Sequence, residues 1–214
     1  MLLLAVDTSG RQGGITLARG HADQIEIIES ASIQGGTFSA ELIPQISELL
    51  DRHQLTPQQL QGLVAVTGPG SFTGLRVGLT AVKGLAEVLR IPIAAVTSLE
   101  LLIEASGEMG VMAVLDAGRG EVYAAVHNGS REERLLSLDE AVALARSRSL
   151  QVLAAEPHIT VRFDRAKLVT YRSTEVAAKI GHSKLLARET IDVLVLDANY
   201  IRRSEAEYMH KMKK

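Results

Sequence analysis

The chain has 214 residues, of which 46% are hydrophobic and 22% charged, so it is long enough for one or two globular domains with a sizeable core. It lacks cysteine, which excludes disulfides and thiolate metal sites, and its formal net charge of −2 argues against nucleic-acid binding by the chain alone. The apolar N-terminal run is too short to span a bilayer and has no basic leader. We therefore expect a cytoplasmic protein without a membrane partner.

Strands are predicted at the start of the chain. Residues 2–6 form a continuous apolar run, which is typical of a strand covered on both faces, and residues 15–18 and 24–30 continue it as a meander. Asp7 stands where the first strand ends. A carboxylate there either caps the turn or holds a hydrated cation, and both interpretations stay open.

A helix is predicted over residues 39–53, with Ser39 as its N-cap. Pro44 lies inside the pattern, where it either kinks the helix or shifts its start toward residue 43. The apolar residues of this segment recur at helical spacing and form one stripe, which consists of Leu42, Ile43, Ile46, Leu49 and Leu50.

The segment 67–84 is the most distinctive part of the sequence. A strand over residues 63–66 leads through a glycine–proline turn into a helix that runs to residue 89. A strand, a glycine turn and a helix N-terminus can together bind an anion, but the spacing Gly-x-Gly-x-x-x-Gly matches neither the dinucleotide motif nor the phosphate loop. An ordinary turn therefore competes with a phosphate site, whose candidate residues are Asp7, Thr8, Ser9, Gly68, Gly70, Ser71, Thr73 and Asp116.

The helix after this turn is rich in glycine. Gly74, Gly78, Ala81 and Leu85 share one narrow face, with Gly84 beside it. A glycine inside a helix costs about 1 kcal/mol relative to alanine, so the close approach of another backbone is expected on this face. That backbone belongs either to the chain's own sheet or to a partner helix, and the two alternatives stay open.

The second half of the chain resembles the first. After a strand over residues 91–96 and a helix over 98–106, a glycine-bounded hinge at 107–110 marks a domain boundary. Residues 111–126 then repeat the order strand, Asp, turn, strand, with Asp116 in the place of Asp7. We predict two α/β subdomains, 1–107 and 108–214, with the tail 196–214 packing back on the first. Strands at 150–154 and 167–171 and helices at 138–148 and 173–189 complete the second.

No catalytic constellation is apparent in the sequence. None of the 6 histidines lies three, four or five residues from another, and the motifs H-E-x-x-H and G-x-S-x-G are absent. Asp7 and Asp116 would form a facing pair across a cleft between the two halves, an arrangement suited to a cation and a phosphate.

The glycine motif G-P-G-S-F-T-G-L-R-V-G at residues 68–78 resembles the TsaB (YeaZ) family, subunits of the bacterial tRNA threonylcarbamoyladenosine (t6A) machinery. Residues 4–9, 92–98, 116–123 and 200–202 are similar to further segments of that family. Two positions depart from its pattern: Phe38 stands where a histidine is common, and Ala198 where a proline is usual.

The resemblance implies an actin/hexokinase/Hsp70-like (ribonuclease H-like) architecture with mixed sheets and flanking helices. It also implies a non-catalytic scaffold that pairs with TsaD, which transfers threonylcarbamoyl to the adenosine beside the tRNA anticodon. TsaE, an ATPase, would bind the pair, tRNA would bind only through the complex, and the chain would form a homodimer without TsaD. No metal or cofactor of its own is expected. The predicted docking surface consists of Leu42, Ile46, Leu49, Gly74, Gly78, Ala81 and Leu85.

Two other functions compete with the scaffold. The first is an active kinase or ATPase of the same fold, with ATP or ADP and Mg²⁺ between Asp7 and Asp116 or at an interface shared with the partner. The other, which ranks below the kinase, is a metallopeptidase-like glycoprotease. The absence of metal-ligand motifs argues against it.

Overall fold

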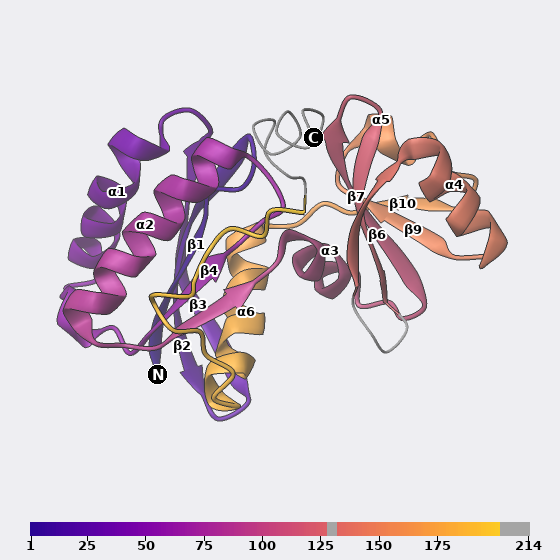
Figure 1. The fold of residues 1–214 in the computed structure, drawn as a ribbon. Coiled ribbons are helices and arrows are strands. Elements are labelled where there is room, and N and C mark those ends of the chain that lie inside the picture. The colour runs from indigo at the N-terminus through magenta and orange to yellow at the C-terminus, as the bar shows by residue number, and fades with distance from the viewer. Residues whose placement is uncertain (128–131, 202–214) are drawn as a thin grey trace.

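A computed structural model describes residues 1–127 and 132–201 of the chain. Two five-stranded sheets form its framework (Figure 1). The first contains β1 (Leu2–Asp7), β2 (Gln12–His21), β3 (Gln24–Gln34), β4 (Gly62–Val66) and β5 (Ile93–Val96). The second contains β6 (Val111–Gly118), β7 (Glu121–His127), β8 (Glu133–Ser137), β9 (Gln151–Ala154) and β10 (Ala166–Leu168).

The two sheets have the same topology. The first runs in the order β3-β2-β1-β4-β5, and the second in the corresponding order β8-β7-β6-β9-β10. In the first sheet, β1, β2 and β3 pair antiparallel, and β4 and β5 extend it parallel to β1. In the second, β6, β7 and β8 pair antiparallel, and β9 and β10 extend it parallel to β6. The predicted α/β fold with two similar halves and mixed sheets is therefore confirmed, and the strand–Asp–turn–strand repeat in the sequence marks its duplication.

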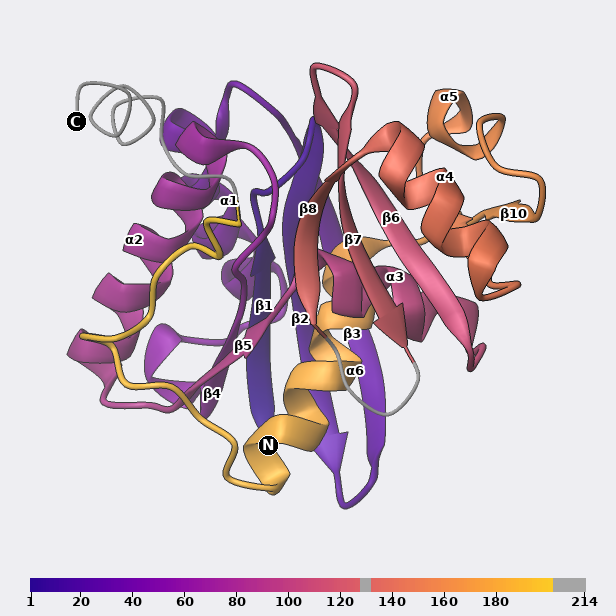
Figure 2. The same ribbon diagram turned by 45° about the vertical axis from the view of Figure 1, so that its right-hand side comes forward.

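Helices cover both faces of the first sheet. α1 (Phe38–Arg52) and α2 (Phe72–Leu89) lie on one face, and α6 (Ser173–Leu186) lies on the other (Figure 2). Successive residues of β1 alternate between the two cores: Leu2, Leu4 and Val6 point toward α1 and α2, and Leu3 and Ala5 toward α6. Burial on both faces explains the unbroken apolar run at the N-terminus.

α1 begins earlier than the sequence predicts. Thr37 precedes the first helical residue, and its carbonyl accepts the amides of Ala40 and Glu41, so neither the predicted cap at Ser39 nor a start near residue 43 is correct. Pro44 lies within α1. Phe38, the residue in place of the family histidine, is buried, and its ring fills the space beside Gly13.

α3 (Ser98–Ser106) lies between the two sheets. Its Leu101 belongs to the core of the first sheet, whereas Leu99, Leu102 and Ile103 join residues of the second. The opposite face of the second sheet is covered by α4 (Leu138–Ser147) and α5 (Pro157–Thr160). A short helix, η1 (Pro57–Gln59), precedes β4.

The end of the described chain returns to the first sheet. α6 packs on β1, β2 and β5, and Ile191 forms an isolated bridge to Ile93. Leu196 and Ala198 are buried in the core under α1 and α2. We call the first sheet with α1, α2, α6 and residues 187–198 the first lobe, and the second sheet with α4 and α5 the second lobe. The predicted domain division at 107/108 stays a prediction. Packing places α6 in the first lobe, in which the chain begins.

β8 was not predicted. It is an edge strand of partly exposed residues without clear alternation of buried and exposed positions, so its sequence carries little strand signal. Within residues 1–127 and 132–201, no helix is both long and apolar enough to cross a membrane.

The glycines of α2 give a matched test of this packing. A Cβ at Gly78 would overlap the Thr8 side chain, whereas a Cβ at Gly84 meets no atom within 4 Å. We expect Gly78→Ala to lower the free energy of unfolding by about 1–3 kcal/mol through overpacking, and Gly84→Ala to raise it by up to about 1 kcal/mol through helix propensity. Urea denaturation of both variants measures the difference. Equal effects would contradict the contact with Thr8.

Candidate functional site

A cavity of about 1300 Å³ lies between the two lobes. The first lobe contributes residues at the end of β1 and the start of α2, and the second contributes the end of β6 and the start of α5. Asp7 and Asp116, at corresponding strand ends of the two duplicated halves, both line the cavity, and their arrangement as a facing pair stays a prediction.

The structure separates the candidate phosphate residues into two groups. Asp7, Ser9, Gly70, Ser71, Thr73 and Asp116 line the cavity, whereas Thr8 and Gly68 do not. Thr8 is buried beneath α2. Gly68 has φ +94°, and a Cβ there would press on Leu75, so turn geometry accounts for this glycine. A ligand-binding role for the lining residues stays a prediction.

Asp7 caps the turn that follows β1. Its side chain is 3% exposed, and its Oδ1 accepts the Ser9 amide at 2.8 Å. Ser9 in turn accepts the Ser71 amide at 2.6 Å through its carbonyl, and the Ser71 hydroxyl accepts the Gly74 amide at 3.3 Å. Two amides at the start of α2 are thus already bonded within the chain, which weakens this helix N-terminus as a phosphate site.

The second lobe brings Asp116, Glu156 and His158 to the cavity wall. Asp116 accepts the Gly118 amide at 2.7 Å and lies 2.9 Å from His158 Nε2. Burial opposes ionisation of Asp116, but these two contacts and the charge of Arg11 from the first lobe hold its pKa below the ordinary value.

Glu156 has the opposite environment. Its Oε2 is fully buried and has no hydrogen-bond partner among the residues that the structure describes. Burial, followed by the negative charge of Asp116, raises its pKa above the ordinary 4.5. Burial, followed by the negative charges of Asp7 and Glu156, raises the pKa of Tyr171 as well. Sequence reasoning missed Glu156, His158 and Tyr171, because no motif surrounds them. Among the described residues, no group of three or more His, Cys, Asp and Glu is placed to hold a metal.

The residues predicted to form a docking surface lie mostly inside the first lobe. Their stripe points at the chain's own sheet: Leu42, Ile46 and Leu49 are buried in its core, Gly74 and Gly78 are buried against Thr8, and Ala81 and Leu85 pack on the same core. The stripe therefore packs on the chain's own sheet, since the apolar side of an amphipathic helix faces the core. Whether the helices bind a partner stays a prediction.

The outer face of α2 has a different composition. At spacings of four residues it presents Phe72, Arg76, Thr80, Gly84 and Val88, all exposed, which we call the α2 ridge. The Phe72 ring lies 5.4 Å from the ring of Tyr200, and the Arg76 guanidinium lies 4.0 Å above the Phe72 ring. Arg76 Nε also donates to the Tyr200 hydroxyl at 3.3 Å. The sequence did not reveal this cluster, because residues far apart in the chain form it.

The duplicated lobes and the cleft between them define a two-lobed α/β protein with mixed sheets. The family model for TsaD, described as tRNA N6-adenosine threonylcarbamoyltransferase, matches residues 32–203. The chain therefore belongs to the TsaD family.

Relatives within this family confirm the resemblance to TsaB (YeaZ). The t6A biosynthesis protein TsaB of Bacillus subtilis is 37% identical over 138 residues, which cover 62% of this chain and 59% of that protein. TsaB of Haemophilus influenzae is 33% identical over 128 residues, which cover 58% and 52%. The chain thus spans little more than half the length of these relatives. The solved structure of YeaZ from Pseudomonas aeruginosa, 22% identical, covers 93% of this chain and 99% of its own with a TM-score of 0.75, a likeness of fold.

Glu156 predicts a pH dependence of stability. A carboxyl whose pKa is raised on folding binds its proton more tightly in the folded state, so stability falls as pH rises from the ordinary value of 4.5 through the raised value. We expect Glu156→Gln to match the wild type below pH 4.5 and to exceed its free energy of unfolding at neutral pH. Urea unfolding of both proteins over this pH range measures the gap. A gap that stays constant with pH would overturn this account of Glu156.

Proposed function

We propose that the chain is a non-catalytic subunit of t6A synthesis that pairs with a TsaD-type threonylcarbamoyltransferase through the outer faces of α1 and α2. The observation that carries this proposal is the α2 ridge, which is exposed along the whole helix. The names of the relatives and of the matching family support the pathway.

Gly84 indicates that a partner backbone approaches the ridge. The other helical glycines, Gly74 and Gly78, are explained by Thr8, but a Cβ on Gly84 has free space around it. Glycine there costs about 1 kcal/mol without an intrachain reason, and close helix–helix contact supplies one. Val88, one turn further on, is 80% exposed. An apolar side chain at this position does not stabilise the monomer, but a partner would bury it.

The ridge also has the residue types that dominate protein interfaces. Aromatic and arginine side chains contribute most of the binding energy in such surfaces, and Phe72, Arg76 and Tyr200 stand together at the start of α2. Ile43 on the neighbouring α1 is 55% exposed and extends the apolar area. This composition favours a protein partner over a purely solvated face.

The remaining assignments follow from the same proposal. TsaE binds the heterodimer, tRNA is engaged through the complex, and the chain forms a homodimer through the ridge in the absence of TsaD, since an isologous contact would cover the same apolar area. The complex acts in the cytoplasm. A net charge of −2 supports tRNA binding through the complex, because the chain alone offers little attraction to phosphates.

A pair of matched substitutions tests the interface. Val88→Glu places a charge on the ridge, and Val161→Glu places the same charge at a site on the second lobe that is equally exposed, 79%. We expect Val88→Glu to lose co-purification with TsaD from the same organism and to abolish tRNA modification in the reconstituted reaction. Val161→Glu should retain both. If Val88→Glu still pairs normally, the ridge is not the interface. Gly78→Leu is unsuitable here, because its side chain would collide with Thr8.

A nucleotide in the cleft is the second candidate function. The cavity is large enough for one, and Asp7 and Asp116 both line it. The described lining includes no lysine, and Arg11 and His158 are its only basic side chains, so charge complementarity to a triphosphate is weak.

Asp7→Asn tests this candidate cleanly, because its amide oxygen still accepts the Ser9 hydrogen bond that holds the turn. An active ATPase would turn over ATP with Mg²⁺, and the variant would lose that turnover without losing thermal stability. No turnover by the wild-type protein at any magnesium concentration would remove the candidate.

A further inference from the structure

The last described residues of the chain connect three parts of the molecule. Ala198 is buried in the first-lobe core, whereas Tyr200 lies on the α2 ridge. The neighbours of Tyr200 point elsewhere: Ile201 packs against the core that α3 shares with the second sheet, and the Asn199 side chain contacts Glu133 at the start of β8. Both residues that flank Tyr200 therefore have side chains that make contacts outside the first lobe.

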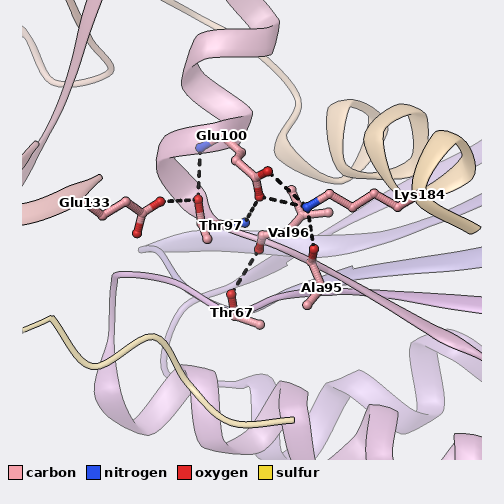
Figure 3. A network of polar contacts seen from close by, with 7 residues as sticks. All are labelled: Thr67, Ala95, Val96, Thr97, Glu100, Glu133 and Lys184. Atoms are coloured by element: carbon pink, nitrogen blue, oxygen red, sulfur yellow. Dashed lines mark hydrogen bonds and ion pairs between the residues drawn. The ribbon is translucent and has the colours of Figure 1, made fainter. Parts of the chain in front are cut away.

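A polar network holds the start of α3 against β5 and α6, next to the residues that contact Asn199 (Figure 3). Lys184 of α6 donates to the Ala95 carbonyl at 2.8 Å and to Glu100 at 3.0 Å. Glu100 accepts the Thr97 amide at 2.8 Å, and the Thr97 hydroxyl accepts the Glu100 amide at 3.1 Å, which closes a capping box on α3. The start of α3 is thus tied to both α6 and β5.

Glu133 of β8 joins the second lobe to the start of α3. One of its carboxylate oxygens accepts a hydrogen bond from the Thr97 hydroxyl (Figure 3). The other accepts one from the Asn199 side-chain amide. The Asn199 backbone amide donates to the Thr67 carbonyl at 2.8 Å. Asn199 is consequently held by the first lobe through its backbone and by the second lobe through its side chain.

We propose that Glu133, through Asn199, positions Tyr200 on the α2 ridge and so couples the arrangement of the two lobes to the partner-binding surface. This inference rests on the proposed function, because the ridge is the surface by which the chain pairs. A displacement of the second lobe moves Glu133 away from Asn199 and Ile201 away from its core. Tyr200, bonded between them, then leaves Phe72 and Arg76.

The coupling works in both directions. A partner that binds the ordered cluster of Phe72, Arg76 and Tyr200 stabilises the lobe arrangement in which Glu133 reaches Asn199, and thereby the shape of the cleft. A ligand that prefers a different cleft weakens the partner by the same factor, since coupling free energies between two binding sites are reciprocal.

An exchange of charge and amide between the two residues tests this proposal. Asn199→Asp sets a second carboxylate against Glu133, and we expect it to weaken TsaD binding by about tenfold, within the usual range of coupling between sites. Adding Glu133→Gln restores a carboxylate–amide pair in reverse and should restore affinity. Glu132→Gln, an exposed neighbour paired with Arg134, is the matched control and should change nothing.

Fluorotyrosine incorporated into the full chain reports the position of Tyr200 by ¹⁹F NMR, with Tyr200→Phe assigning the resonance. In the absence of TsaD we expect Asn199→Asp to shift this resonance toward that of a solvent-exposed tyrosine, and the double variant to return it. An unchanged resonance, or a loss of affinity that Glu133→Gln fails to rescue, would overturn the proposal. If the wild-type chain does not bind TsaD, the proposed function fails, while the resonance still decides whether Glu133 positions Tyr200.

Discussion

The contact between α2 and the turn after β1 is the constraint on which the rest of the structure depends. Positions 74 and 78 carry no side chain, so the helix backbone lies directly on Thr8. This contact orients α2 about its own axis, because any rotation would bring a Cβ-bearing residue against the turn. It therefore determines which side of the helix meets solvent, and it places Ser71 at the mouth of the cleft.

Duplication explains why the cleft exists and why its two walls differ. Asp7 and Asp116 each accept the amide two residues on, but only Asp116 also pairs with a histidine, His158, and has a buried glutamate beside it. The two lobes thus share a topology but place different charged side chains on the cleft walls. α3 serves as the common wall, since its opposite sides enter the cores of both sheets.

Much of the fold could be predicted from the sequence, because apolar periodicity and turn residues report burial directly. The glycine motif also located the turn before α2 and the helix that follows it. Sequence reasoning failed where a pattern has two physical causes. A stripe such as Leu42, Ile46 and Leu49 has the same spacing whether it faces a sheet or a partner, and only the fold shows that it packs on the sheet. Edge strand β8 and the contacts of Glu133 and Tyr200 depend on long-range packing, for which a single sequence holds no local signal.

The path of the chain has a mechanical consequence. Because α6 returns to the lobe in which β1 lies, the second lobe is inserted into the first and is joined to it by two backbone crossings, one after α3 and one before α6. Two connecting segments restrain the lobes more than one would, because they leave hinge rotation about the line between them easier than twisting or separation. Any change in the angle between the lobes must therefore be absorbed at these two crossings, and Tyr171, packed into the cores on both sides, lies beside the second of them.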